Sequence, residues 1–129
     1  MVGVVIISHS SKVAEGVKEI ALQMATLTPI AAAGGTKENG IGTDIEKITS
    51  AINQVYSEDG VVILFDLGSA YMNATMAIEF LPEEMQKNII VIDVALVEGA
   101  IAVAVESGIG KNLVEIQEAV NDLCLHKMP

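Results

Sequence analysis

Four short apolar runs stand out along the chain, each four to six residues long. They are residues 2–7, 30–33, 61–65 and 89–92, and Val, Ile and Ala fill most of their positions. Runs of this length, bounded by residues such as Gly, Ser and Asp, are typical of buried β-strands. We therefore predict four buried strands.

The segments between these runs carry apolar residues at helical spacing. In the first segment they recur at intervals of four and three, which predicts an amphipathic helix that Pro29 stops. Its apolar stripe consists of Val13, Val17, Ile20, Met24 and Leu27. The same reasoning predicts helices over residues 69–81 and 95–106, and a last helix opened by Asn112.

A helix start is also marked in the second segment. Thr43 and Glu46 stand at the spacing of a capping box, in which the two side chains cap each other's backbone N–H groups. Apolar residues follow at helical spacing, namely Ile45, Ile48, Ile52 and Val55. We predict a helix that Thr43 caps.

Strands that alternate with helices favour one fold class. The order β-α-β-α-β-α-β-α-α implies parallel strands joined by right-handed crossovers. We therefore expect an α/β fold with an open, mostly parallel sheet and helices on both faces, similar to flavodoxin. With 129 residues and no linker or internal repeat, the chain is expected to form one domain over residues 1–129.

Composition and charge narrow the function. Hydrophobic residues make up 51% of the chain, enough for a substantial core, and the formal net charge of −10 disfavours nucleic acid as a partner. No basic segment precedes the first apolar run, so no signal peptide is expected, and Asp93 and Glu98 interrupt the most apolar stretch. We expect a cytoplasmic protein without a membrane partner.

Candidate chemistry gathers where the predicted strands end, because ligands of open α/β sheets bind beyond the carboxyl ends of the strands. His9 follows the first strand and precedes a helix, where free N–H groups favour an incoming dianion. A neutral imidazole is a nucleophile near physiological pH. A hydrogen-bonded loop histidine is the alternative reading of His9.

Asp66, at the end of the third strand, is the natural companion of His9. A carboxylate that holds one ring N–H leaves the other ring nitrogen free to attack, although helix capping is a second reading of Asp66. Small and glycine-bearing loops at the strand ends offer N–H groups for a phosphoryl group, or are simply tight turns. Their candidate residues are Ser10, Gly35, Thr36, Gly68 and Ser69.

Other common sites do not match. The glycines at 35–42 lack the Lys of a P-loop and the third Gly of a dinucleotide fingerprint. No acidic pair resembles a magnesium site, so we expect no metal and no cofactor. Cys124, Met72 and Met76 are expected to pack in the interior, with a partner surface as the alternative for the two methionines, and His126 is expected to have no special role.

Four segments together resemble a known family. They are Val4-Val5-Ile6-Ile7-Ser8-His9-Ser10, Gly34-Gly35-Thr36, Phe65-Asp66-Leu67-Gly68-Ser69-Ala70-Tyr71-Met72-Asn73 and Val97-Glu98-Gly99-Ala100. In this order they resemble the phosphocarrier subunits of phosphotransferase-dependent dihydroxyacetone kinases, which belong to the mannose-type enzyme IIA superfamily. The resemblance extends nearly end to end, to about Leu123.

The resemblance implies a flavodoxin-like homodimer whose His9 is phosphorylated by the phosphocarrier protein HPr, with Asp66 as the supporting carboxylate. It implies transfer onward to the ADP-containing, DhaL-type kinase subunit, as part of a phosphotransferase with a phosphohistidine intermediate. Some family members carry fused donor domains, whereas here the donors are expected to be separate proteins.

Two rival functions remain open from the sequence. A mannose-type enzyme IIA domain that donates phosphate to a sugar-transporter IIB subunit would share His9 and Asp66. A non-catalytic interaction module on the same fold is disfavoured, because both residues are intact.

Overall fold

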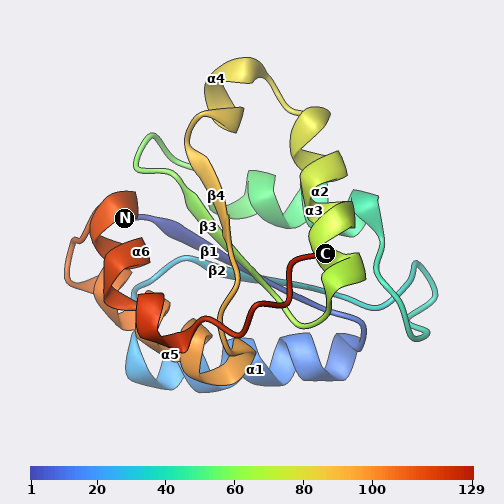
Figure 1. The fold of residues 1–129 in the computed structure, drawn as a ribbon, viewed down its shortest axis with the longest axis horizontal. Coiled ribbons are helices and arrows are strands. Elements are labelled where there is room, and N and C mark those ends of the chain that lie inside the picture. Colours follow the sequence, from blue (N-terminus) through green and yellow to red (C-terminus); the bar gives the residue numbers. More distant parts are fainter.

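The computed structural model describes residues 1–129 and contains one four-stranded parallel sheet (Figure 1). The strands are β1 (Gly3–Ser8), β2 (Ile30–Gly34), β3 (Val61–Phe65) and β4 (Ile89–Ile92), which confirms the four predicted strands. Their spatial order is β2-β1-β3-β4, and all neighbouring pairs are parallel. The predicted α/β class with a flavodoxin-like parallel sheet is confirmed.

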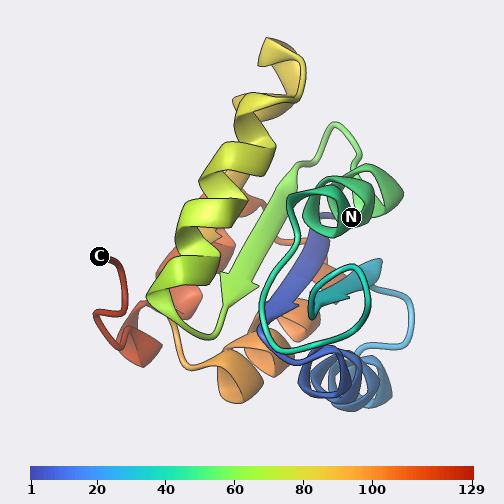
Figure 2. The same cartoon turned by 90° about the vertical axis from the view of Figure 1, so that its right-hand side faces the viewer.

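Helices cover both faces of the sheet (Figures 1 and 2). Their bounds are α1 (Ser11–Met24), α2 (Ile45–Val55), α3 (Gly68–Glu79), α4 (Glu83–Gln86), α5 (Leu96–Gly108) and α6 (Leu113–Ala119), followed by a 3-10 turn at Asn121–Leu123. Two separate core clusters result. One packs α1, α5 and α6 against one sheet face, and the other packs α2 and α3 against the opposite face.

The buried face of helix α1 is shifted from the predicted stripe and shares only Val17 with it. Its buried residues are Ala14, Val17 and Ala21, while Ile20 and Met24 are exposed. The helix ends at Met24, before the predicted stop. Small alanines let α1 lie close to the sheet and α5, and the larger aliphatic side chains are left outside. Hydrophobic spacing alone does not register this difference in side-chain size.

The predicted capping box at Thr43 is wrong. Helix α2 is capped by Asp44, whose side chain accepts a hydrogen bond from Lys47 N at 3.0 Å. The Thr43 hydroxyl instead accepts a hydrogen bond from the Asn73 side chain on α3. Thr43 therefore ties the loop before α2 to α3, and the cap falls one residue later.

Three side chains expected in the interior lie at the surface. Met72 is 57% exposed and Met76 is 46% exposed, because α3 packs on the sheet through Ala70, Ala74 and Ala77. Cys124 is exposed as well, in the extended segment after the last turn. The interior reading of the two methionines is therefore wrong, and a partner surface remains open for them.

The crossover pattern places the ends of β1 and β3 together. The chain leaves β1 toward β2 and later returns across β1 to β3, so the strand order reverses between β1 and β3. Register pairs Ile7 with Phe65, so the next residues along both strands emerge side by side. Such a switch point is where open α/β sheets form their sites.

The C-terminal segment returns to this same edge of the sheet. Val94 forms an antiparallel bridge with Cys124, and Ala95 N donates to Leu123 O at 3.0 Å. The chain then crosses toward α3, where its end lies in Figure 1. None of the helices is both long enough and apolar enough to cross a bilayer.

Candidate functional site

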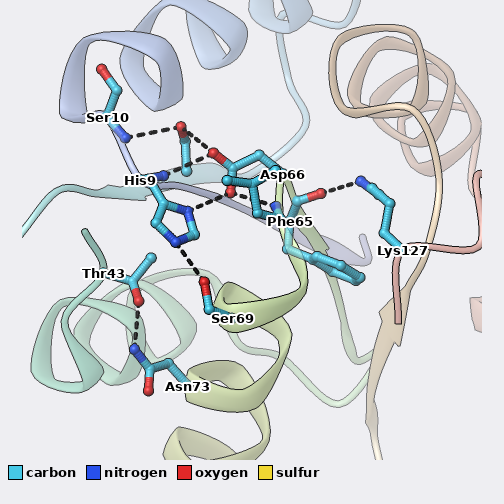
Figure 3. A network of polar contacts seen from close by, with 10 residues as sticks. His9, Ser10, Thr43, Phe65, Asp66, Ser69, Asn73 and Lys127 are labelled. Carbon is cyan, nitrogen blue, oxygen red and sulfur yellow. Dashed lines mark hydrogen bonds and ion pairs between the residues drawn. The ribbon is translucent and has the colours of Figure 1, made fainter. Parts of the chain in front are cut away.

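The two residues that follow the ends of β1 and β3 meet directly. The His9 ring nitrogen Nδ1 lies 2.9 Å from Asp66 Oδ1, and the His9 backbone N–H donates to Asp66 Oδ2 at 2.9 Å (Figure 3). Both side chains are about one-fifth exposed. The predicted pairing of His9 with Asp66 is thus present in the geometry, and the ring is accessible at the surface.

Asp66 is held as a carboxylate by its hydrogen bonds. Besides the two bonds from His9, Oδ2 accepts from the Ser8 hydroxyl at 2.9 Å and Oδ1 accepts from Leu67 N at 2.7 Å. Burial of the group raises its pKa, but the donors from His9, Ser8 and Leu67 outweigh this and bring the pKa of Asp66 below its ordinary value. Asp66 is therefore ionised at neutral pH.

The ionised carboxylate sets the tautomer of His9. A carboxylate only accepts, so the proton of the neutral ring resides on Nδ1. Nitrogen Nε2 then carries a lone pair, and the Ser69 hydroxyl, 2.7 Å away, donates to it (Figure 3). The nitrogen available for attack is Nε2, on the side of the ring that faces the start of α3.

The first turn of α3 offers unused hydrogen-bond donors beside Nε2. The α3 N-cap position is Leu67, with no side-chain cap, so Asp66 is not the cap of this helix. The N–H groups of Gly68 and Ser69 have no acceptor within the chain. Such donors at a helix N-terminus favour a phosphoryl dianion.

The other predicted loop residues are near the site but differently engaged. Gly35 N donates to Ser8 O at 3.2 Å, and Thr36 N donates to Gly40 O at 3.0 Å, so both N–H groups already have partners. Gly35 has a φ of +77°, which explains a glycine there. Ser10 caps α1 by accepting from Val13 N at 3.3 Å, and Ser10 N donates to the Ser8 hydroxyl at 3.1 Å.

Sequence reasoning missed two parts of this arrangement. Ser8 is buried, and its hydroxyl links Asp66 to the start of α1. Lys127 lies beside Phe65 and donates to the carbonyls of Phe65 and Val94 (Figure 3). A serine next to the candidate histidine was a visible signal, whereas a lysine in the last few residues of the given sequence was not.

The site is an open surface rather than an enclosed pocket. The two largest hollows lie beside α2 and α3, and between α2, α1 and β2, and neither has His9 in its lining. No group of three His, Cys, Asp or Glu side chains is arranged to hold a metal ion. The geometry can activate an imidazole nitrogen and receive an anion, presented from outside the chain.

Known proteins carry the same fold and related sequences. A family model described as the fructose IIA component of the PTS system, EIIA-man, matches residues 3–117. A crystal structure of EF1359, described as a protein of unknown function, superposes with a TM-score of 0.84 at 34% identity over 94% of this chain and 93% of that one. A sigma-54 interaction domain protein from Enterococcus faecalis, at 17% identity, has a TM-score of 0.71 and shares the fold.

Curated relatives narrow the family further. The phosphoryl donor subunit DhaM of the dihydroxyacetone kinase of Escherichia coli is 38% identical, with 88% of this chain matching 25% of that protein. A Listeria innocua DhaM is 36% identical over 83% of this chain and 86% of its own length. The Lactococcus lactis DhaM is 30% identical over 97% and 98% of the two chains. The chain therefore spans a quarter of the first relative and nearly all of the third.

The family match covers β1 through most of α6, including both strand ends that form the site. The relatives that match over most of their own length are all DhaM subunits. The chain belongs to the mannose-type enzyme IIA family, and within it to the DhaM subunits of PTS-dependent dihydroxyacetone kinases.

Proposed function

We propose that this chain is a phosphohistidine carrier that accepts a phosphoryl group on Nε2 of His9. The donor is HPr, and the acceptor is the ADP held by a DhaL-type kinase subunit. The observation that carries the proposal is the His9–Asp66–Ser69 arrangement, in which Nδ1 is held at 2.9 Å and Nε2 faces a hydroxyl donor at 2.7 Å.

Accepting the phosphoryl group requires Ser69 to turn away from Nε2. The Nε2 lone pair then attacks the phosphorus of the donor's phosphohistidine, the new N–P bond forms, and the donor's N–P electron pair returns to its imidazole. The His9 ring gains positive charge, which Asp66 stabilises through Nδ1–H. The Ser69 hydroxyl and the free N–H groups of Gly68 and Ser69 are placed to receive the phosphoryl oxygens.

The second step reverses these roles. A terminal oxygen of ADP attacks the phosphorus, the His9 N–P bond breaks, and its electron pair returns to Nε2 as ATP forms on the partner. Neither step moves a proton onto Asp66, whose low pKa keeps it ionised throughout. The scheme gives this chain no cofactor or metal of its own, and any metal belonging to the nucleotide is held by the partner.

An open, partly apolar surface suits a donor and an acceptor that are proteins. Leu67 and Met72 lie on either side of Ser69 in the sequence, and each is 57% exposed. Methionine side chains adapt to more than one partner surface, and this carrier must bind two. We infer that these residues contact HPr and the kinase subunit in turn, while the acidic chain, with a net charge of −10, favours basic partner surfaces.

We further propose that residues 1–129 act as one cytoplasmic domain that pairs as a homodimer. The short strand β4 lies at an edge of the sheet, and an edge strand is stabilised by being covered. Light scattering at working concentration tests this, with twice the chain mass expected. A scattering mass equal to one chain would contradict it.

A transfer assay tests the proposed function. The chain is first phosphorylated with phosphoenolpyruvate, enzyme I and HPr, then separated and mixed with either a DhaL-type subunit carrying ADP or a IIB domain of a mannose-type transporter. We expect loss of the phosphoryl group, with ATP formed, only in the first mixture. Loss only to the IIB domain would favour the rival enzyme IIA function, since the family model is described as a IIA component.

A further inference from the structure

We propose that Lys127, in the C-terminal segment, is a positioning residue that fixes Asp66 and, through it, the His9 ring. This inference rests on the proposed use of His9. Lys127 does not contact His9. It donates to the backbone carbonyl of Phe65, the residue directly before Asp66, and to the carbonyl of Val94, just beyond β4.

The Lys127 ammonium bridges two strand ends. It donates to the carbonyl of Phe65, the last residue of β3. It also donates to the carbonyl of Val94, two residues beyond β4, and this second bond is 2.8 Å long. The pairing of β3 with β4 ends at Leu64 and Ile92, one residue before Phe65 and two residues before Val94. Lys127 thus continues the cross-link between these chains past the point where the strand pairing stops.

The position of Phe65 determines where Asp66 can lie. Asp66 follows Phe65 directly, and its carboxylate must reach His9 N and Nδ1 together, each at 2.9 Å. A displacement of a few tenths of an ångström at the end of β3 would lengthen both bonds. Fixing the Phe65 carbonyl therefore restricts the geometry that sets the His9 tautomer.

Lys127 is itself held in place, both through its side chain and through the backbone around it. Its ammonium lies 4.6 Å from the centre of the Phe65 ring, a cation–π distance. The next residue is anchored, because Met128 N donates to Asp93 Oδ2 at 2.8 Å. The Lys127 carbonyl rests on Gly68, where an added Cβ would lie 3.0 Å from the oxygen. An exposed, mobile lysine would have none of these three contacts.

The alternative is that Lys127 only fastens the tail to the body of the protein. The two roles differ in what happens to the His9 ring when the ammonium is removed. If Lys127 only fastens the tail, removing its ammonium frees residues near 124–129 and leaves the His9 ring unchanged. If Lys127 is a positioning residue, removing its ammonium weakens the hydrogen bond from His9 Nδ1–H to Asp66 in the unphosphorylated protein.

The test is the exchange rate of the His9 Nδ1 proton with water, together with the 15N shifts of both ring nitrogens, in the full-length unphosphorylated protein. In Lys127→Met we expect exchange to be faster by roughly three- to tenfold, as for the loss of about one hydrogen bond. Both ring nitrogen shifts should move toward an average of the two tautomers. Lys127→Arg, which keeps a cation with several N–H donors, should restore the original values at least in part.

The matched control is Lys111→Met, an exposed lysine whose side chain has no hydrogen-bond partner or ion pair, and it should leave the ring unchanged. Unchanged His9 signals in a folded Lys127→Met protein, even with a loosened tail, would overturn the proposal. If the Met variant does not fold, Lys127→Gln, which keeps a donor for one carbonyl, is measured against the same two outcomes. Because the readout needs no phosphate, its failure is separate from a failure of the carrier function.

Discussion

Asp66 binds His9 twice, once through the backbone and once through the ring. Oδ2 accepts the His9 backbone N–H and Oδ1 accepts the ring Nδ1–H, both at 2.9 Å. A single carboxylate therefore fixes where His9 leaves β1 and how its ring is turned. This leaves the ring few ways to rotate, and Nε2 stays directed at the start of α3.

Removing this carboxylate should slow transfer far more than it affects folding. In Asp66→Ala nothing holds the His9 ring in its Nδ1–H tautomer or stabilises the charge that the ring gains. Loss of an orienting Asp lowers the catalytic rate about 10⁴-fold in a serine protease triad. We expect a folded protein whose rate of phosphorylation by phosphorylated HPr falls by about three to four orders of magnitude. Rapid-quench measurement of this rate is the check.

A matched control for Asp66→Ala is Asp59→Ala, because Asp59 is an exposed acid paired only with the chain's own N-terminus. It should transfer at the original rate. If Asp66→Ala also transferred at that rate, the orienting role assigned to Asp66 would be wrong.

Ser69 should matter for the rate but less than Asp66 does. Its hydroxyl is 2.7 Å from Nε2 and is placed to bind a phosphoryl oxygen after transfer. Hydrogen bonds to charged groups are worth about 1.5–3 kcal/mol, so Ser69→Ala should lose roughly ten- to a hundredfold in transfer rate. Thr75→Ala serves as the control on the same helix, since its hydroxyl bonds only to Met72 O. If the two variants transferred at equal rates, the assigned role of Ser69 in binding the phosphoryl group would be wrong.

The low pKa of Asp66 predicts how stability depends on pH. Because the pKa is lower in the folded protein than in the unfolded chain, the unfolded chain binds the proton first as pH falls. The stability that Asp66 contributes is present above its unfolded pKa of about 3.9 and is lost as pH drops through the folded value. Above that range the contribution should be constant.

This pH dependence is measured as a difference, since the chain has 17 acidic residues. Urea unfolding of the original protein and of Asp66→Asn is compared from pH 7 down to the acid limit. The gap in unfolding free energy should be constant near neutral pH and shrink on the acid side. A gap that grew as the solution became more acidic would contradict the sign of the shift.

Much of this site could be predicted from the sequence because parallel strands end on one edge. Once four strands were recognised, His9 and Asp66 were both expected at that edge, and the register, which pairs Ile7 with Phe65, brings Asp66 beside Ser8, the residue before His9. The N–H groups of Gly35 and Thr36 could not be judged in the same way. Whether a loop N–H is free depends on partners such as Ser8 O and Gly40 O, which only the folded loop defines.

The buried face of α1, the bond of Thr43 and the contacts of Lys127 could not be predicted, because each depends on side-chain size or on residues far away in the sequence. The buried face of α1 follows alanines at positions 14 and 21, and the hydrophobic pattern gives more weight to larger residues such as Ile20. Thr43 does not cap α2 as expected, because its hydroxyl accepts a hydrogen bond from Asn73, which is 30 residues away in the sequence. Lys127 reaches Phe65 across 62 residues. Contacts of this range have no local signature in the chain.

The position of the phosphoryl group tests the central claim most directly. Intact-mass and peptide analysis after incubation with phosphoenolpyruvate, enzyme I and HPr is carried out on the original protein, His9→Ala and His126→Ala. His126 is the control because it is the only other histidine. We predict one phosphoryl group per chain, lost in mild acid but stable in base, present in His126→Ala and absent in His9→Ala. A phosphoryl group on His126, or an acid-stable one on a serine, would contradict the account.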